Sequence, residues 1–330
     1  MSGPTMRAWW IRTDADAMVL ELREVPQPAP GPGQLAVRIE AAALNRGEFI
    51  AGHGLHAAGA PARPAGFEAA GTVTAAGPGV QGWQPGDRVM GRCDGAFAEH
   101  GLMEAGEAFA MPGALSWEQA ACSTVTYLTA HDMLMAQGRL RAGEWLLVTG
   151  IASGVGVAAF QVAQALGARV MGTSGSSAKL ERLQALGLDV ALHTRGPDFV
   201  PTVRQASGGR GVDLVVNTVG GSVFAACVEA LAFEGRLATV GYVDGVVAAP
   251  LDLMALHKKR LVLFGVSNKL RTVAHRVAAA QAFARDLLPL MAEGRLLPMV
   301  DAVFPFEGLE DARQAMVSGQ HVGKIVLRMG

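Results

Sequence analysis

The chain has 330 residues, half of them hydrophobic and 17% charged, with a formal net charge of −1. This length suffices for about two domains of ordinary size, and the hydrophobic content excludes a disordered chain. No basic run is present that would follow a nucleic-acid backbone, and no apolar stretch reaches the about 20 residues that a membrane-spanning helix needs. We therefore expect a folded protein that binds neither nucleic acid nor membrane.

Cysteine usage and the first residues bear on the compartment. The three cysteines, Cys93, Cys122 and Cys227, form no CxxC pair, which argues against a zinc knuckle and against a disulfide framework. Residues 1–10 lack a basic region followed by an apolar stretch, so no signal peptide is visible. Free thiols suit a reducing compartment, and the expected location is cytoplasmic.

The first third of the chain is predicted to be rich in strands. Residues 35–40 alternate between apolar and polar side chains, as a half-buried strand does, and residues 71–77 look similar. Helical patterning begins at Ser116, a plausible N-cap, and Gln119 completes a capping box.

Strands and helices alternate from residue 145 to residue 266, as a parallel sheet with crossover helices requires. Helical runs end at or near glycines, as in residues 178–187 and 222–233. The predicted strands, whose number matches a doubly wound sheet, are residues 144–148, 168–173, 189–192, 212–217, 236–241 and 261–266.

A glycine-rich turn joins the first two of these strands through a helix over residues 157–166. Such glycines let the backbone turn tightly and approach a pyrophosphate, whose charge the helix N-terminus stabilises. The strand, turn, helix, strand order is that of a dinucleotide-binding unit, whereas an isolated glycine triplet would equally indicate an ordinary turn. The predicted phosphate-binding residues are Ala152, Ser153, Gly154, Val155 and Gly156.

The tail of the chain is predicted to return to the strand-rich first part. A long helix is expected over residues 272–293. Strands are expected over residues 300–304 and 324–327, on either side of a helix near residues 309–318.

Several short motifs together resemble the medium-chain dehydrogenase/reductase superfamily over nearly the whole chain. They are residues 64–73, 86–89, 128–130, 152–156, 211–213 and 323–327. Within that superfamily the chain most resembles the zinc-independent NADPH:quinone oxidoreductases, and residues 258–327 resemble the p53-inducible branch. The resemblance implies an α/β fold, with a Rossmann doubly wound parallel sheet and a β-rich GroES-like catalytic domain. We expect residues 1–126 and 268–330 to form the catalytic domain and residues 127–267 the NADP-binding domain.

The resemblance also locates the positions that hold catalytic zinc in zinc alcohol dehydrogenases. Here they carry Asn45, Phe67 and Val125. A phenyl ring does not ligate zinc, and a catalytic zinc needs three protein ligands. Cys122 lies one helical turn before Val125, so a slipped alignment would restore one ligand but not three. We expect the protein to use no metal.

The cofactor is expected to be NADPH. NAD-selective folds place an acidic residue about 20 residues after the first glycine, whereas this chain has Ser174 and Gly175 there. Lys179 follows, where the resemblance implies a lysine for the 2′-phosphate, and the hydroxyls of Ser174 and Ser176 would bind that phosphate with it. Arg195 lies where the family uses a tyrosine. The alternative is that a serine such as Ser176 caps the helix and that Lys179 is solvated.

Further cofactor contacts are implied by the resemblance. Thr129 would face the nicotinamide amide, and Lys324 and Asn45 would lie near the cofactor. The alternatives are that Thr129 is an ordinary helix residue and that Lys324 is an exposed strand end. The nicotinamide pocket would be lined at the strand ends by Val240, Gly241, Tyr242, Phe264, Gly265 and Val266.

Three residues are candidates for catalysis. Asn45 stands in the place of a metal ligand and is predicted to donate a hydrogen bond to the acceptor carbonyl, unless it only caps its own loop. His56 would donate a proton or stack on a quinone, but a surface histidine is equally consistent with its glycine-rich loop. Tyr127 would serve as an acid, although an aromatic residue on a helix is more often part of the core.

The predicted function is zinc-independent, NADPH-dependent reduction of a quinone. The alternative is an alkenal or enoyl double-bond reductase, which would need an acid near the α-carbon. A non-catalytic NADPH-binding protein is a third interpretation, and a zinc alcohol dehydrogenase is the last. The expected partners are a small-molecule quinone or enone and a second copy of the chain, with residues 261–266 as an edge strand that supports a homodimer.

Overall fold

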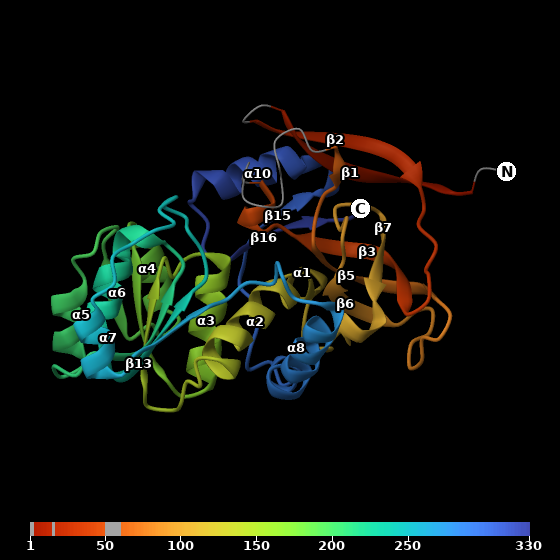
Figure 1. Cartoon of the computed structure of the whole chain (residues 1–330). Coiled ribbons are helices and arrows are strands. Elements are labelled where there is room, and N and C mark those ends of the chain that lie inside the picture. Colours follow the sequence, from red (N-terminus) through yellow and green to blue (C-terminus); the bar gives the residue numbers. More distant parts are fainter. Residues whose placement is uncertain (1–2, 15–16, 50–60) are drawn as a thin grey trace. The chain divides into compact units, whose positions relative to one another are not determined.

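The computed structural model describes residues 3–14, 17–49 and 61–330, and the chain divides into two compact units. Unit 1 comprises Met1–Val125 and Val273–Gly330, and unit 2 comprises Thr126–Thr272 (Figure 1). The sequence-based boundaries, after residues 126 and 267, lie close to these divisions. Among the helices of the described ranges, none combines the length and the apolar character that crossing a bilayer requires.

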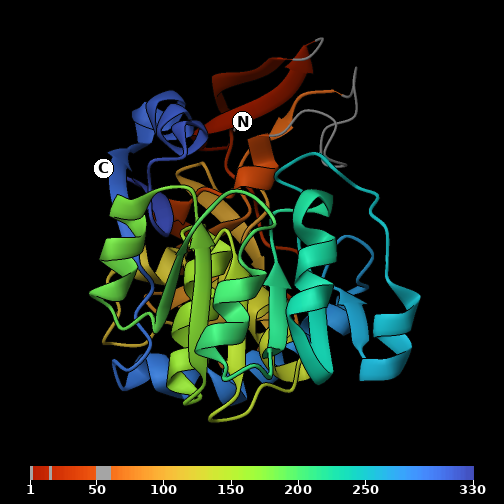
Figure 2. The same cartoon turned by 90° about the vertical axis from the view of Figure 1, so that its left-hand side faces the viewer.

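A six-stranded sheet forms the centre of unit 2, in the order β11-β10-β9-β12-β13-β14, and all its neighbours are parallel. Helices pack across the face of this sheet that Figure 2 turns toward the viewer. The strands are β9 (Trp145–Thr149), β10 (Arg169–Ser174), β11 (Val190–His193), β12 (Val212–Asn217), β13 (Leu231–Thr239) and β14 (Val262–Gly265). The helices are α2 (Thr124–His131), which contains the unit boundary, α3 (Gly154–Ala165), α4 (Ser177–Gln184), α5 (Val200–Ala206), α6 (Phe224–Ala230) and α7 (Leu253–Lys259).

The apolar strands in the middle of this sheet explain its stability. Every residue of β9 and β12 is buried, as expected where helices cover both faces of a parallel sheet. Their side chains join one hydrophobic cluster with residues of β10, β11, α5 and α6. The doubly wound parallel sheet predicted from the alternating pattern is thus confirmed, as is the edge position of the strand near residues 261–266.

The helix predicted over residues 222–233 is wrong at its end. Helix α6 stops at Ala230, and β13 begins at Leu231. Glu234 then adopts a φ of 57°, and a Cβ on Gly235 would lie 2.9 Å from the carbonyl oxygen of Ala232, so the chain bends sharply inside this strand. Periodicity alone does not separate a short buried apolar strand from a continuing helix.

Unit 1 contains two sheets. The larger has the order β15-β16-β3-β5-β6-β8, with β7 also paired to β3, and the smaller has the order β2-β1-β4. The strands are β1 (Thr5–Asp14), β2 (Ala17–Pro26), β3 (Gln34–Ala43), β4 (Arg63–Pro64), β5 (Glu68–Ala76), β6 (Arg88–Arg92), β7 (His100–Glu104), β8 (Ala108–Ala110), β15 (Val300–Pro305) and β16 (Lys324–Arg328). Strand β16 pairs antiparallel with β3, so the tail does return to the first part of the chain (Figure 1).

The helices of unit 1 are α1 (Trp117–Ala121), α8 (Val273–Asp286), α9 (Leu288–Ala292) and α10 (Leu309–Ser318). Helix α1 has the predicted capping box, because the Ser116 side chain accepts from the Gln119 amide and Gln119 reciprocates. The single helix expected over residues 272–293 is instead divided between α8 and α9. Pro289 explains the division, since a proline ring disfavours helical backbone in the preceding residue and donates no hydrogen bond.

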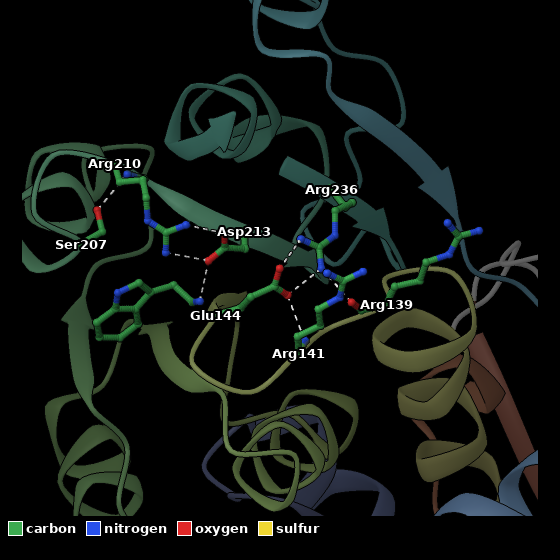
Figure 3. A network of polar contacts seen from close by, with 9 residues as sticks. Arg139, Arg141, Glu144, Ser207, Arg210, Asp213 and Arg236 are labelled. Carbon is green, nitrogen blue, oxygen red and sulfur yellow. Dashed lines mark hydrogen bonds and ion pairs between the residues drawn. The ribbon is translucent and has the colours of Figure 1, made fainter. Parts of the chain in front are cut away.

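The amino ends of the unit 2 strands are tied together by charged side chains (Figure 3). Arg236 of β13 donates to Glu144 at 2.8 Å and to the carbonyl oxygen of Gly138 at 2.8 Å. Asp213 of β12 accepts from the Trp145 amide at 2.8 Å. Ligands of such sheets bind at the opposite, carboxyl edge, so this network stabilises the fold and leaves the other edge for function.

Candidate active site

The predicted phosphate-binding turn lies at the carboxyl end of β9, where α3 begins. Gly150 adopts a φ of 66°, and Ser153 caps α3, with its Oγ accepting from the Gly156 amide at 3.1 Å. The first N–H groups of a helix have no partner within the helix and suit an anionic phosphate. The other predicted residues of the turn and helix start are Ala152, Gly154 and Val155.

Packing requires glycine at two positions around this turn. A Cβ on Gly156 would lie 2.6 Å from the carbonyl oxygen of Ile151, and a Cβ on Gly172 would lie 2.3 Å from the Ile151 side chain. The turn therefore fits tightly against both α3 and β10. A side chain at position 156 would fill the cradle, so the backbone here fits the pyrophosphate of a dinucleotide.

Asn217 organises the same edge at the end of β12, although its sequence position suggested no function. Its buried Oδ1 accepts from the amides of Val219 and Gly220, both at 3.1 Å, and from Thr149 Oγ1 at 3.0 Å. A short side chain that accepts from its own backbone two and three residues later stabilises a turn. Asn217 thus fixes the loop that leaves β12 beside the glycine turn.

The strand-end residues predicted to line the nicotinamide pocket follow two adjacent strands of this edge. The Val240 amide donates to the carbonyl oxygen of Asn217 at 3.0 Å, and the Val266 amide donates to that of Thr239 at 3.0 Å. Tyr242 is 45% exposed. The structure therefore places these residues at the carboxyl ends of β13 and β14: Phe264 and Gly265 are the last residues of β14, Val266 follows them, and Val240, Gly241 and Tyr242 follow β13.

The end of β10 carries the residues predicted to bind the 2′-phosphate. The Thr194 amide donates to the carbonyl oxygen of Ser174 at 3.1 Å, so the ends of β10 and β11 lie together. Arg195 passes over Gly175 so closely that a Cβ there would lie 2.2 Å from Arg195 Nε. The guanidinium of Arg195 is exposed, and within the described residues it makes no hydrogen bond or ion pair.

The alternative interpretation of this segment was a serine cap with a solvated lysine, and the structure bears on the cap. Ser176 is the N-cap of α4, but its side chain makes no capping hydrogen bond, and its amide instead donates to Ser174 Oγ at 3.3 Å. Lys179 is half-buried.

Two predicted residues lie on α2. Tyr127 is 2% exposed, and its hydroxyl donates to the side chain of Gln161 on α3, which favours the interpretation that it belongs to the core of unit 2. A hydroxyl held in this way is poorly placed to protonate a substrate. Thr129 is half-buried on the same helix.

A second group of candidates meets inside unit 1, around the buried carboxylate of Glu68. Lys324 Nζ donates to Glu68 Oε1 at 2.8 Å, to Asn45 Oδ1 at 2.7 Å and to the Leu44 carbonyl oxygen at 2.8 Å. Asn45 Nδ2 donates to Glu48 Oε1 at 2.8 Å and to Glu68 Oε1 at 3.1 Å. The group was not predicted from sequence, because Glu68 and Lys324 lie far from Asn45 in the chain and only Glu48 is local to it.

The second oxygen of Glu68 reaches the start of α2. Glu68 Oε2 accepts from Thr124 Oγ1 at 3.2 Å and from the Val125 amide at 2.8 Å. The Glu68 side chain has no exposed surface. Its two oxygens therefore connect β5, which carries Glu68, to Lys324 at the start of β16 and to Thr124 and Val125 at the start of α2.

These contacts argue against two of the alternative interpretations. Lys324 is not an exposed strand end, because it is 5% exposed and three acceptors take its three N–H groups. Asn45 is not simply a loop cap, because its side chain bridges Lys324, Glu48 and Glu68. Both N–H groups of Asn45 point to carboxyl oxygens, so the predicted donation to an acceptor carbonyl would require one of these bonds to break.

Charge in this group is nearly balanced. Burial raises the pKa of Glu48 to about 8, while its hydrogen bond from Asn45 and the charges of Lys324 and Arg63 act in the opposite direction. Lys324 and Glu68 form an ion pair at 2.8 Å with almost no exposed surface. At neutral pH, Glu48 is therefore mainly a neutral acid beside a compensated pair.

The donors at the former zinc positions do not fit a zinc ion. Phe67 offers no lone pair, and Asn45 Oδ1 already contacts the ammonium of Lys324. Burial raises the pKa of the Cys122 thiol, which opposes the thiolate that zinc needs. Within the described ranges, no group of three histidine, cysteine or acidic residues is arranged to hold a metal. His56, the remaining catalytic candidate, lies outside the described residues.

Two known protein families match this chain, one mainly over unit 2 and the other mainly over unit 1. Residues 154–282 match the family described as zinc-binding dehydrogenase, and residues 31–135 match the alcohol dehydrogenase GroES-like domain. The fold and site thus define an oxidoreductase. The chain belongs to the medium-chain dehydrogenase/reductase superfamily, in its zinc-independent quinone oxidoreductase family.

Two curated relatives illustrate the range of that family. The chain is 33% identical over 332 residues to the human synaptic vesicle membrane protein VAT-1 homolog, a match that covers 96% of this chain and 84% of the relative. It is 34% identical over 309 residues to a phenolphthiocerol/phthiocerol polyketide synthase of Mycobacterium tuberculosis. That match covers 93% of this chain but only 14% of the synthase, so the chain corresponds to a small part of that relative.

Solved structures show the same fold along the whole chain. A mycobacterial protein complexed with NADPH has 30% identity and a TM-score of 0.85, with 98% of this chain and 99% of that chain covered. A mycobacterial quinone oxidoreductase has 29% identity, a TM-score of 0.84 and the same coverage. The CurK enoyl reductase has 26% identity and a TM-score of 0.84, with 99% of both chains covered. The matched fold and the NADPH complex support a nicotinamide cofactor.

Proposed function

We propose that this protein is an NADPH-dependent, zinc-independent quinone reductase. The proposal is carried by two of the three positions that hold zinc in zinc alcohol dehydrogenases: here one is the ring of Phe67 and another is Asn45, which Lys324 fixes. A quinone becomes a fairly stable anion on reduction, so it needs neither a Lewis acid nor a strong proton donor. An acceptor of this kind suits the side chains present here.

The choice of NADPH rests on the end of β10. Ser174 and Gly175 leave no carboxylate there to repel a 2′-phosphate, and Arg195 crosses Gly175. Arginine binds phosphate through paired N–H groups, which gives both charge and direction. The relative solved with NADPH supports the same cofactor. When bound, the nicotinamide supplies the hydride, and this chain holds the phosphates at Gly156 and the α3 N-terminus.

One observation favours a second candidate, a reductase of alkenals or enoyl thioesters. Reduction of a carbon–carbon double bond needs a proton at the α-carbon, and Glu48 is an acid that burial keeps neutral near pH 7. The match to part of a polyketide synthase and to an enoyl reductase points the same way. Both candidates share the cofactor, the fold and a conjugated carbonyl acceptor.

An acceptor panel distinguishes these candidates. NADPH oxidation is followed with 1,4-benzoquinone and 9,10-phenanthrenequinone beside 2-hexenal and crotonyl-CoA, and each assay is repeated with NADH and after EDTA treatment. The proposal predicts NADPH-selective turnover of quinones that EDTA does not change. Turnover of the alkenes alone would move the assignment to the second candidate, and bound NADPH without any turnover would favour a non-catalytic role.

A homodimer is proposed on the basis of β14. This strand is the edge of the unit 2 sheet, and Val262 on it is 52% exposed. An uncovered edge strand offers a row of backbone groups that a second copy can pair. Sedimentation equilibrium tests this, because a charged side chain on the exposed edge, as in Val262→Lys, should shift a dimer toward monomer.

A further inference from the structure

Arg63 holds its guanidinium against the ring that stands in a zinc-ligand position. The guanidinium carbon of Arg63 lies 5.2 Å from the centroid of the Phe67 ring, within the range of a cation–π contact. Both side chains are half-buried, so they border solvent or a ligand rather than the centre of the core. The pair thus presents a planar cation over a planar aromatic surface.

The backbone that carries this pair is held firmly in place. The Phe67 carbonyl oxygen accepts from the Cys93 amide at 2.9 Å, and that of Ala65 accepts from the Phe97 amide at 2.9 Å. Gly66 adopts a φ of 96°, and a Cβ there would lie 2.6 Å from the Phe97 nitrogen. Only glycine permits this approach, so residues 63–67 form a rigid support for the two side chains.

The neighbouring donors Lys324 and Asn45 are already committed, whereas a guanidinium has more N–H groups than an ammonium or an amide. Lys324 directs its three N–H groups, and Asn45 its two, to acceptors within unit 1. A guanidinium has five N–H groups in one plane, so it can donate hydrogen bonds to partners in the protein and to an oxygen of a ligand as well. Compared with Lys324 and Asn45, Arg63 is thus the better suited to a ligand.

The surrounding charge leaves Arg63 positive. Lys324 and Glu68 compensate each other as an ion pair, and Glu48 is mainly neutral at pH 7 because burial raises its pKa to about 8. Burial lowers the pKa of Arg63, and the charges of Glu48 and Asp94 act in the opposite direction, but an arginine stays protonated at this pH. A half-buried positive charge of this kind attracts an oxygen that becomes negative.

We propose that Arg63, held against Phe67, binds the carbonyl oxygen of the acceptor and stabilises the negative charge that this oxygen gains on reduction. This inference rests on the proposed function. The acceptor gains a hydride from the nicotinamide at one end of its conjugated system, so one C–H bond breaks, another forms, and the nicotinamide is oxidised. The displaced electron pair comes to rest on the carbonyl oxygen at the other end, and a proton from water later neutralises it. Arg63 thereby takes over the charge-stabilising role of a metal.

The test compares Arg63→Met, which keeps an apolar stem over the ring, with Arg63→Lys and with the control Arg88→Met. Arg88 makes an equivalent contact, with its guanidinium 4.4 Å from the Trp117 ring, but it is exposed and lies elsewhere in unit 1. We expect Arg63→Met to lower kcat/KM for 1,4-benzoquinone by about a hundredfold or more, as loss of one oxyanion donor does. Arg63→Lys should recover part of this, Arg88→Met should match the wild type, and NADPH affinity should stay unchanged in all three.

A second readout needs neither cofactor nor turnover. 4-Nitrophenol is yellow only when ionised, so its colour reports the charge state of the bound phenol. At a pH about one unit below its solution pKa, the wild type should increase the ionised fraction, and Arg63→Met should not. Equal ionisation or equal kcat/KM in wild type and Arg63→Met would overturn the inference, as would a wild type that does not bind the ionised form. If the wild type reduces no acceptor at all, the proposed function fails instead.

Discussion

The nucleotide edge of unit 2 and the Glu68 group of unit 1 are built in opposite ways. The edge consists of backbone: a glycine turn, a helix N-terminus and strand ends that follow one another in the chain. The Glu68 group consists of side chains from residues 45, 48, 68 and 324, joined by hydrogen bonds of 2.7–3.1 Å. A site built of backbone is disturbed by added volume, whereas the stability of a buried group of charged side chains depends on the balance of their charges. The two should therefore fail under different substitutions.

Removing the cation of the Glu68 group should have the largest effect. Lys324→Met leaves the carboxylate of Glu68 buried without its ion pair, and breaking one partner of a buried pair costs about 3–5 kcal/mol. Urea unfolding, followed by tryptophan fluorescence, measures the loss. The double variant Lys324→Met/Glu68→Gln should regain part of it, because no charge is left unpaired. A single variant as stable as the wild type would contradict the charge dependence of this group.

Added volume at the nucleotide edge should have the next largest effect. A Cβ in Gly156→Ala would lie 2.6 Å from the Ile151 carbonyl oxygen, and overpacking of this kind costs about 1–3 kcal/mol. NADPH affinity should fall with it, since the turn must move. Thermal unfolding and NADPH fluorescence measure both. Gly113→Ala, where no heavy atom lies within 4 Å, is the control and should change neither.

Cofactor selectivity offers a finer test of the same edge. Arg195→Ser should weaken NADPH binding by about 10–100-fold, because hydrogen bonds to a charged group contribute about 1.5–3 kcal/mol. NADH binding should be unchanged. Gly175→Ala should act in the same direction without loss of stability, since its Cβ would displace only the flexible Arg195 side chain. Titration of each variant with NADPH and with NADH measures both affinities, and the exposed Arg204→Ser is the control. Equal losses of affinity for NADPH and NADH would show that Arg195 takes no part in binding the 2′-phosphate.

The smallest effect concerns pH. Glu48 has a pKa of about 8 in the folded chain against an ordinary value of 4.5, so the folded state binds more protons between these values. Stability should therefore fall as pH rises through this window, by at most about 1.4 kcal/mol per pH unit. Glu48→Gln keeps the acceptor for Asn45 but removes the titration, so its melting temperature should change less between pH 6 and 8. Parallel pH dependence in both proteins would show that Glu48 does not titrate there.

The same contrast explains how much could be predicted from sequence. The turn at Gly150–Gly156, the strands of unit 2 and the return of β16 were predictable, because local periodicity and glycine spacing encode them. The burial of Lys324 was not, since it depends on Asn45 and Glu68, which are far away in the chain. The role of Asn217 was missed although two of its donors are local, because its third partner, Thr149, is far away in the chain. The break before Pro289 was missed because the apolar pattern continues through it.

We propose that this chain transfers hydride from NADPH to a quinone without a metal. The most direct measurement is the rate of NADPH oxidation by 1,4-benzoquinone with EDTA-dialysed protein, using NADPH and NADPH deuterated at the transferred position. We predict turnover that survives dialysis and slows with the deuterated cofactor. Turnover that dialysis abolishes and zinc restores, or no turnover with any acceptor of the panel, would contradict it.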